Sequence, residues 1–407
     1  MDCSLRPGLS ARRAFSPAWA AGMLLWLAAA GSAFAATPAD APKARTAREI
    51  APADVRPHVE YLASPRLAGR SGDGARAAAE YVRRHFEKCG LEPLFDGGYF
   101  QEIPAPRTEG DGPGVMGRNV GAWLPGSDPR RRDEFIIVSA HYDHLGTRNG
   151  NVYAGADDNA SGVAMMLEVA KALAQPGARP SCSVAFVGFD LEERMLWGSR
   201  WFAAHPPWPL EQLRLFITAD MIGRSLGRLD LPAVFVLGSE HAPRLKRTLD
   251  AVEPPEGLEV SRLGIDLIGT RSDYGPFRDR EVPFLFFSTG QSAVYHTPDD
   301  VPETLDYEKL ARVTQLVRDI VLRNAADAER PAWVAIPVPD IDEAQTLYRI
   351  ATLLLDADSG TKLSDVQRLV VSHTRNRTKQ IVDRGTITPD ERSWLTKVAQ
   401  VLLLTVF

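Results

Sequence analysis

Four continuous apolar runs divide the chain, and each ends in, or is followed by, a histidine or acidic residues. The runs cover residues 134–141, 183–189, 215–219 and 283–288. A short apolar run closed by polar residues and glycine predicts a strand buried on both faces of a parallel sheet. Open α/β sheets bind their ligands at the carboxyl ends of the strands. We therefore expect the polar residues that follow the four runs to lie close together.

Helical periodicity lies between and beyond these runs. Residues 162–173 place apolar side chains on one face, and residues 75–89 do the same before Gly90, which predicts a helix end. Three more helices are predicted in the C-terminal segment, at residues 344–355, 363–382 and 389–404. The last of them begins with a capping box formed by Thr388 and Glu391.

Composition is that of a globular protein of 407 residues, with 44% hydrophobic and 24% charged residues. This is enough for a large core and, by length alone, for two or three domains. The formal net charge is −5, so we expect no nucleic acid as a partner.

The first residues predict export. Two arginines precede an apolar stretch at residues 18–30, and a small-residue pattern follows that ends at Ala35. This arrangement is typical of a signal peptide over residues 1–35 that is cut before Ala36. The stretch is too short for a comfortable membrane span, so we expect a periplasmic or secreted protein with no stable membrane span after cleavage.

His141 ends the first run and is followed by Asp143 and His144. A carboxylate two residues after a histidine is placed to accept one imidazole N–H and to leave the other nitrogen free for a metal. By itself, the same pattern more often indicates a hydrogen-bonded histidine in a loop. His144 is interpreted as a loop residue or a support for the ligands.

Acidic residues and a second histidine follow the later elements. Asp158 lies in an acidic cluster before a predicted helix, where the helix dipole stabilises carboxylates, although such a cluster alone is typical of a helix cap. Glu192 and Glu193 follow the second run, where one glutamate suits a metal and the other suits general base catalysis. Adjacent glutamates are also common at solvated helix starts. Asp220 follows the third run, and His296 comes shortly after the fourth.

The candidate metal ligands combine two imidazoles with three carboxylates: His141, Asp158, Glu193, Asp220 and His296. Imidazole nitrogen and carboxylate oxygen are both good donors to Zn²⁺, so the set suits two zinc ions, although other divalent first-row metals compete for such ligands. Each part of the pattern has an ordinary explanation. Four strands that deliver such residues to one sheet edge together favour a metal centre.

In this order the segments resemble the zinc aminopeptidases of the M28 peptidase family, with bacterial leucine-type aminopeptidases as the nearest examples. The resemblance rests on His-Tyr-Asp-His at 141–144, Gly-Ala-Asp-Asp-Asn-Ala-Ser-Gly at 155–162, Glu-Glu at 192–193, Asp-Met-Ile-Gly at 220–223 and Tyr-His-Thr-Pro-Asp-Asp at 295–300. It extends upstream to residues 61–70 and covers roughly residues 55–325. It implies a three-layer αβα sandwich of the zinc exopeptidase (phosphorylase/hydrolase-like) type, with a mixed, mostly parallel central sheet and a C-terminal helical extension.

The resemblance also implies a role for each candidate residue. The implied ligands are Asp158 as the bridge between two zinc ions, His141 and Asp220 on one ion, and Glu193 and His296 on the other. Glu192 would be the general base, and Tyr295 would donate a hydrogen bond to the oxyanion of the tetrahedral intermediate. A cis peptide is implied between Asp158 and Asn159. The implied substrates are peptides with a free N-terminus, whose ammonium group the acidic residues would hold.

Two segments depart from the family pattern. Residues 194–199 read Arg-Met-Leu-Trp-Gly-Ser where the family usually has Gly-Leu-Leu-Gly-Ser, and Asp190 stands where small or apolar residues are common. Residues 272–277 resemble the family's Ser-Asp-His loop, with Tyr274 in place of the histidine. These departures leave the side-chain preference open.

The expected organisation is a signal peptide (1–35), an N-terminal lead (36–54), an M28-like catalytic domain (55–325) and a helical appendage (331–407). The appendage has no counterpart in the family's minimal domain. Its apolar residues at 401–407 need burial against the catalytic domain or a second subunit, so shielding, substrate gating and homo-oligomer formation stay open. Cys89 and Cys182 permit one disulfide but do not predict it.

Three alternatives to an aminopeptidase remain. The same scaffold supports carboxypeptidases and glutaminyl cyclases, and a cyclase would need only one zinc ion and would release ammonia. A non-catalytic binding protein on a peptidase fold is the third alternative. Such relatives typically lose ligands, and the complete set here argues against it.

Overall fold

The computed structural model describes residues 48–105, 114–356 and 360–406. The expected signal peptide and its cleavage site lie outside the described residues. Residues 45–407 form one compact unit, and the division into a catalytic domain and an appendage stays a prediction. Among the described residues, no helix is both long and apolar enough to cross a membrane.

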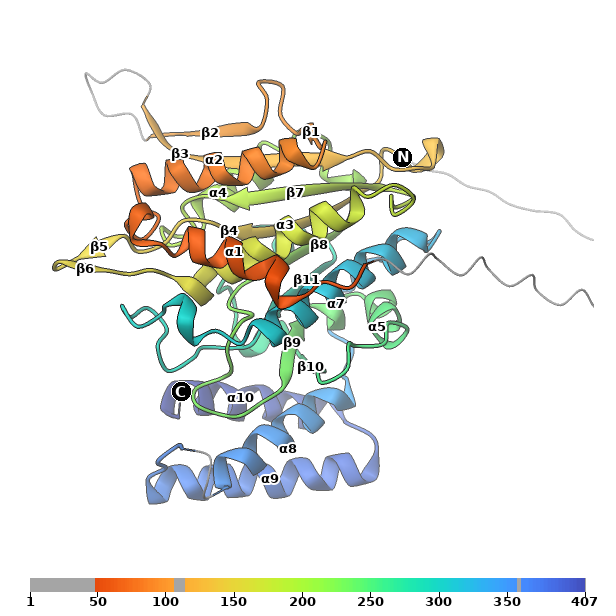
Figure 1. Cartoon of the computed structure of the whole chain (residues 1–407). Coiled ribbons are helices and arrows are strands. Elements are labelled where there is room, and N and C mark those ends of the chain that lie inside the picture. Colours follow the sequence, from red (N-terminus) through yellow and green to blue (C-terminus); the bar gives the residue numbers. More distant parts are fainter. Residues whose placement is uncertain (1–47, 106–113, 357–359, 407) are drawn as a thin grey trace, which may run out of the picture. The chain divides into compact units, whose positions relative to one another are not determined.

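A nine-stranded mixed sheet forms the middle layer, in the order β1-β3-β7-β4-β8-β11-β9-β10, with β2 paired to β3 (Figure 1). Its strands are β1 (Glu92–Pro93), β2 (Phe100–Pro104), β3 (Val115–Leu124), β4 (Phe135–His141), β7 (Ser183–Phe189), β8 (Leu213–Ala219), β9 (Ala233–Leu237), β10 (Glu259–Leu263) and β11 (Phe284–Ser288). The two remaining short strands, β5 (Thr147–Arg148) and β6 (Asn151–Val152), form a separate hairpin. The four predicted runs became β4, β7, β8 and β11, which are mutually parallel at the centre of the sheet.

Helices cover both faces of the sheet (Figure 1). They are α1 (Pro52–Leu62), α2 (Asp73–Lys88), α3 (Gly162–Leu173), α4 (Trp197–Ala204), α5 (Pro243–Asp250), α6 (Gly275–Arg278), α7 (Tyr307–Ala326), α8 (Ile341–Leu355), α9 (Asp365–Arg384) and α10 (Pro389–Thr405). The predicted helices at 75–89, 162–173 and in the C-terminal segment are confirmed within a few residues at each end.

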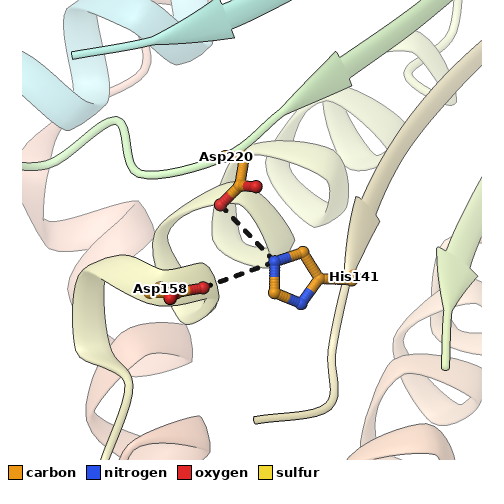
Figure 2. A group of neighbouring side chains, drawn as sticks. All are labelled: His141, Asp158 and Asp220. Carbon is orange, nitrogen blue, oxygen red and sulfur yellow. Dashed lines mark ion pairs between the residues drawn. The ribbon is translucent and has the colours of Figure 1, made fainter. Parts of the chain in front are cut away.

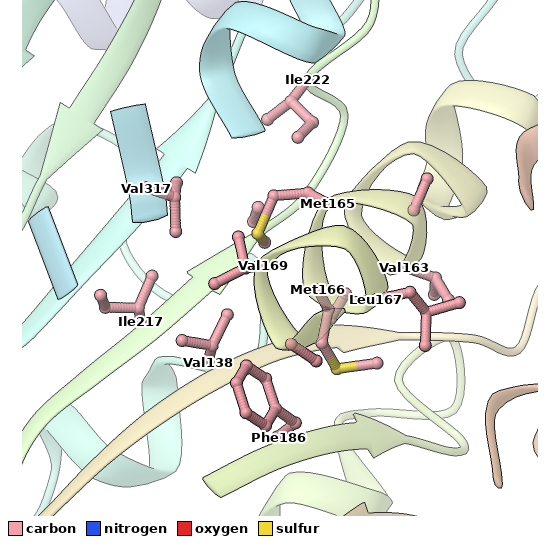
Figure 3. Close-up of a cluster of buried hydrophobic side chains, with 14 of the residues drawn as sticks. Val138, Val163, Met165, Met166, Leu167, Val169, Phe186, Ile217, Ile222 and Val317 are labelled. Atoms are coloured by element: carbon pink, nitrogen blue, oxygen red, sulfur yellow. The ribbon is translucent and has the colours of Figure 1, made fainter. Parts of the chain in front are cut away.

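Alternate strand residues enter two separate cores, because successive side chains of a strand point to opposite faces. On one face, Val138, Phe186 and Ile217 pack against α3 and against Val317 of α7 (Figure 3). On the other face, Phe216 belongs to a second cluster with residues of α4, α6 and α8–α10. The expected three-layer αβα sandwich with a mixed sheet is therefore confirmed.

The C-terminal helices lie on the second face, beside the edge strand β10. The Thr346 hydroxyl of α8 donates a hydrogen bond to the Arg262 carbonyl of β10 at 3.1 Å. The predicted capping box is present, since Thr388 and Glu391 each accept a hydrogen bond from the other's backbone N–H. Helices α8–α10 thus extend the sandwich at the β10 end of the sheet.

Candidate metal centre

The register of the central strands brings the candidate residues to one sheet edge. His141, the last residue of β4, lies opposite Phe189, the last residue of β7, so the Glu192–Glu193 pair follows at the same level. Ala219 of β8 lies opposite Phe287 of β11. Asp220 therefore emerges beside His141, as the position of strand ends in open α/β sheets predicts.

The first group consists of His141, Asp158 and Asp220, all buried (Figure 2). The Nε2 atom of His141 lies 3.4 Å from Asp158 Oδ1 and 3.4 Å from Asp220 Oδ1. Donor atoms that surround one tetrahedral Zn²⁺ at about 2.1 Å are separated by about 3.4 Å. The three side chains thus have the spacing of ligands to one ion.

The second group contains the other oxygen of the same aspartate. Asp158 Oδ2 lies 3.1 Å from His296 Nε2, which is itself 3.3 Å from Glu193 Oε2. His144, interpreted from the sequence as a loop or supporting residue, also belongs here: its Nδ1 lies 2.8 Å from Glu193 Oε1 and 3.9 Å from Asp158 Oδ2. All five predicted ligands are therefore brought together, with His144 as an unexpected neighbour.

The turn that carries Asp158 is η3 (Ala156–Ser161), directly before α3. The Asn159 amide donates a hydrogen bond to the Ala219 carbonyl at 2.8 Å, which ties the turn to the end of β8. The carboxylate of Asp300 accepts the backbone N–H groups of Asp157 at 2.9 Å and of Asp158 at 3.1 Å. The peptide bond between Asp158 and Asn159 is cis, as the family resemblance implies.

Asp143 supports the centre differently from the expected arrangement. His141 Nδ1 lies 3.3 Å from the backbone carbonyl of Asp143 and 3.6 Å from its carboxylate. The carboxylate instead accepts the backbone N–H groups of Glu192 at 3.1 Å and Glu193 at 3.3 Å. Asp143 thus positions the two glutamates at least as much as it orients the imidazole.

Burial governs the protonation of the two groups expected to act on substrate. It raises the pKa of Glu192 well above the ordinary value of a glutamate, against the lowering effect of the nearby His141. It also raises the pKa of Tyr295, so that the phenol stays protonated and can donate a hydrogen bond. The Tyr295 ring stacks on the His296 ring, with centroids 3.8 Å apart. Tyr295 and His296 line the same cavity as Glu192.

The donor atoms of the centre fit a bound cation. Several are buried without a hydrogen-bond partner: His141 Nε2, His144 Nδ1 and Nε2, Glu193 Oε1 and Asp220 Oδ1. The His144 and Glu193 atoms lie close together but are not aligned for a hydrogen bond. Unpartnered polar atoms are costly in a protein interior, and this His and carboxylate set suits Zn²⁺.

The profile of peptidase family M28 matches residues 119–321, about half of the chain and the part that carries these ligands. The chain belongs to peptidase family M28. Its sequence is 26% identical over 296 residues to leupeptin-inactivating enzyme 1 of Streptomyces exfoliatus and 26% identical over 215 residues to aminopeptidase YwaD of Bacillus subtilis. These alignments cover 70% and 50% of this chain, but only 58% and 44% of the two relatives, so the chain spans about half their length. A glutaminyl-peptide cyclotransferase of Bos taurus is 28% identical over 46% of this chain and 62% of its own length.

Solved structures share the fold of this M28 chain. An aminopeptidase from Aneurinibacillus sp. strain AM-1 superimposes with a TM-score of 0.51 at 17% identity, over 72% of this chain and 97% of that one. A glutaminyl cyclase from Bacteroides thetaiotaomicron superimposes with a TM-score of 0.52 at 17% identity, over 68% and 99% of the two chains. The fold alone therefore does not separate these two activities.

Arg70 is a further residue of the site, and the strand-end pattern of the sequence does not predict it. Its guanidinium is fully buried and donates hydrogen bonds to five backbone carbonyls: those of Leu62, Tyr142, Ala154, Gly155 and Asp158. Arg70 therefore connects the turn that carries Asp158 to the segments at Leu62 and Tyr142. The only signal in the sequence was its place at the end of the upstream motif, residues 61–70.

The residues that depart from the M28 pattern lie either in the core or beside a cavity. Tyr274, which replaces the family's histidine, is a core residue whose ring stacks on Phe284 and whose hydroxyl donates a hydrogen bond to the Gly269 carbonyl at 2.5 Å. Asp190 is buried, and its carboxylate accepts the backbone N–H of Arg118 at 3.0 Å. Asp190 and Arg194 line a cavity on the Asp143 side of the centre, away from Tyr295. Neither residue lines the larger cavity that begins at Glu192 and Tyr295.

Proposed function

We propose that this M28 protein is an exported dizinc aminopeptidase. The observation that carries the proposal is the position of Asp158, whose two carboxylate oxygens face two different groups of histidine and carboxylate donors. Such an aspartate is suited to bridge two ions about 3.5–4 Å apart. Membership of the M28 family and the similarity to aminopeptidase YwaD support the same activity.

In the proposed reaction, His141 and Asp220 would hold one zinc ion, Glu193 and His296 would hold the other, and Asp158 would contribute to both. When bound, the ions would lower the pKa of a water between them and polarise the scissile carbonyl. Glu192 takes the proton of the attacking water and returns it to the leaving amine. The Tyr295 hydroxyl donates a hydrogen bond to the developing oxyanion, which is the charge that an active site must stabilise.

The substrate in this proposal is a peptide with a free amino terminus. A cluster of buried carboxylates beside the metals favours a nearby ammonium group by charge, and so favours trimming over internal cleavage. A panel of aminoacyl-4-nitroanilides and dipeptides, assayed with and without a chelator, tests this. We expect release of the N-terminal amino acid that chelator abolishes and zinc restores. Cleavage that resists chelation, or cleavage within N-acetylated peptides only, would refute the proposal.

Glutaminyl cyclisation is the second candidate, because a cyclotransferase is among the relatives and a glutaminyl cyclase shares the fold. A cyclase needs one zinc ion and converts N-terminal glutamine into pyroglutamate and ammonia. Zinc counting by native mass spectrometry, combined with product analysis of Gln-peptides, separates the two. Two ions with free amino acid as product support the aminopeptidase, and one ion with ammonia supports the cyclase.

Export is proposed from the first 35 residues. N-terminal sequencing of protein recovered from the periplasm or medium of a bacterial host should begin at Ala36. Protein that remains in the cytoplasm with Met1 intact would contradict export.

A further inference from the structure

A cavity of about 720 Å³ begins at the metal centre, where its lining includes Glu192, Asp220, Tyr295 and His296. From there it extends over the second face of the sheet, the face that carries α8–α10. Phe235 of β9 is part of this lining and belongs to the core cluster of that face. The space is therefore continuous from the reacting groups to the C-terminal helices.

The far wall of the cavity comes from the helices that the family's minimal domain lacks. Leu347 and Ile350 of α8 contribute to it, together with Leu402, Leu403 and Leu404 of α10. Leu402 is buried, Leu403 is half-buried and Leu404 is exposed, so the wall runs from the interior to the mouth. The sequence analysis expects the apolar C-terminal residues to be buried against another part of the protein. Leu402, Leu403 and Leu404 instead line this cavity.

The remaining lining is mostly apolar as well. Leu237 of β9 and Phe286 of β11 face the same space, and a few polar residues such as Arg271 and Gln291 complete it. Cavities of about 300–1,000 Å³ bury most of a drug-sized molecule. This cavity therefore has room for a whole large side chain, with apolar contacts along its length.

Specific contacts fix α10 in this position. Arg392 of α10 makes two hydrogen bonds with the Asp266 carboxylate, at 2.8 and 3.0 Å, and the Gln400 amide donates to the Asp266 carbonyl at 3.0 Å. Asp266 belongs to η6 (Ile265–Leu267), and the chain continues from it into Ile268 and Gly269, which also line the cavity. Helix and lining loop are thereby held as one wall.

We propose that α8 and α10 form the far wall of the pocket for the substrate's N-terminal side chain, and that they select peptides with a large apolar N-terminal residue such as phenylalanine. The proposal rests on the aminopeptidase function proposed above. Without these helices, the outer end of the pocket would open to water and an apolar side chain would lose its contacts. Discrimination by an apolar pocket amounts to about 10–200-fold for each methylene-sized difference.

A matched pair of substitutions on α10 tests the wall. Leu403→Trp fills the cavity from its half-buried edge, whereas Val401→Trp adds the same bulk to a 45% exposed position outside the lining. We expect Leu403→Trp to lower the ratio of kcat/KM for phenylalanyl- over alanyl-4-nitroanilide at least tenfold, through KM. Val401→Trp should keep the wild-type ratio. If Leu403→Trp and Val401→Trp have the same ratio of kcat/KM for phenylalanyl- over alanyl-4-nitroanilide, the proposal is overturned.

A second pair guards against a packing defect in the first. Leu404 is 80% exposed at the mouth, so Leu404→Glu places a charge at the cavity without disturbing the core, and Val401→Glu is its control. We expect only Leu404→Glu to weaken the preference for phenylalanyl substrates. If both Leu404→Glu and Leu403→Trp keep the wild-type preference for phenylalanyl substrates, α10 does not select the N-terminal side chain.

A binding measurement separates this proposal from the proposed function. Calorimetry with L-phenylalaninol and the zinc-loaded protein should show binding with a negative heat-capacity change, the mark of apolar burial, and Leu403→Trp should weaken binding at least tenfold. If no aminoacyl substrate is hydrolysed but this binding is observed, the aminopeptidase proposal is refuted and the pocket proposal is supported. If hydrolysis occurs but Leu403→Trp binds L-phenylalaninol as tightly as the wild type, the pocket proposal is refuted and the aminopeptidase proposal is supported.

Discussion

Asp158 presents its two carboxylate oxygens to different histidines, 3.4 Å from His141 and 3.1 Å from His296. No other described side chain is shared by both candidate ligand groups. Removal of this aspartate should therefore affect two metal positions at once, whereas loss of any other ligand affects one.

We expect Asp158→Ala to lose both zinc ions, because each ion keeps only two of its proposed protein ligands. Inductively coupled plasma mass spectrometry of dialysed protein measures the zinc content. Asp299→Ala, which removes an exposed carboxylate near His296, serves as the control and should keep two zinc ions. A stoichiometry unchanged by Asp158→Ala would remove it as the bridge.

Glu192→Gln should keep the fold and the metal ions but lower kcat about 10²–10⁴-fold, the usual contribution of a general base. Glutamine preserves the size of the side chain but cannot accept the proton. Steady-state kinetics at saturating substrate, with zinc content measured on the same sample, makes the comparison. Wild-type turnover in this variant would exclude Glu192 as the base.

His144 and His296 compete for the second ligand position, since both approach Glu193. We expect His296→Asn to bind one zinc ion and His144→Asn to bind two with lower affinity, because the family resemblance implies His296 as the ligand and leaves the fully buried His144 side chain as its support. Zinc titration with a fluorescent chelator as competitor distinguishes them. The reverse result would assign His144 as the ligand and His296 as a support.

Four of the five candidate ligands could be predicted from the sequence because they end or follow a recognisable strand, and the fifth, Asp158, because it lies in an acidic cluster directly before a predicted helix. His144 and Asp300 could not be placed in the same way. His144 approaches Glu193 across 49 positions of the chain, and Asp300 binds backbone N–H groups of a turn more than 140 residues away. Contacts to a distant backbone leave no periodicity or spacing in the sequence.

At the scale of elements, the segment at residues 68–70 fixes the turn that carries the candidate ligand Asp158. Ala68, Gly69 and Arg70 all have positive φ angles, and a side chain at Gly69 would collide with the carbonyl oxygens of Gly146 and Tyr153 at 2.5 Å. This tight turn delivers the Arg70 guanidinium to its five carbonyls. The pattern of apolar residues predicts the strands and helices. It does not predict this turn, because the turn depends on contacts with residues that are distant in the sequence.

Arg70→Lys should destabilise the protein by about 3 kcal/mol and weaken zinc binding. Hydrogen bonds from charged groups contribute about 1.5–3 kcal/mol each, and an ammonium has fewer donors in a different geometry. Urea unfolding and zinc titration measure the two effects. Arg66→Lys, an exposed neighbour, is the control. Equal stability of both variants would contradict the role of Arg70.

At the scale of the whole molecule, the C-terminal helices are attached through a cluster of charges. Arg392 lies 3.1 Å from Glu343 of α8 and also binds Asp266. Burial raises the pKa of Glu343 to about 8, against the lowering effect of Arg392 and with a further raising effect of Glu240. The attachment of α8–α10 is therefore sensitive to pH.

Folding should become less favourable as pH rises towards 8. Between the ordinary glutamate pKa and about 8, the folded protein binds more protons at Glu343 than the unfolded chain does, so the free energy of unfolding falls with pH in this window. The slope is on the order of 1 kcal/mol per pH unit. Urea unfolding at pH 6 and pH 8 tests this.

Glu343→Gln should flatten this pH dependence, because it removes the titrating group. The exposed Glu253→Gln should leave the slope as in wild type. If both variants retain the same slope, Glu343 is not its source.

The candidate metal ligands extend along the chain from His141 to His296, and the far wall of the cavity beside them comes from α8 and α10. We therefore expect a nascent chain to lack the full set of candidate ligands until His296 has been translated, and to lack the far wall of the cavity until α10 has folded.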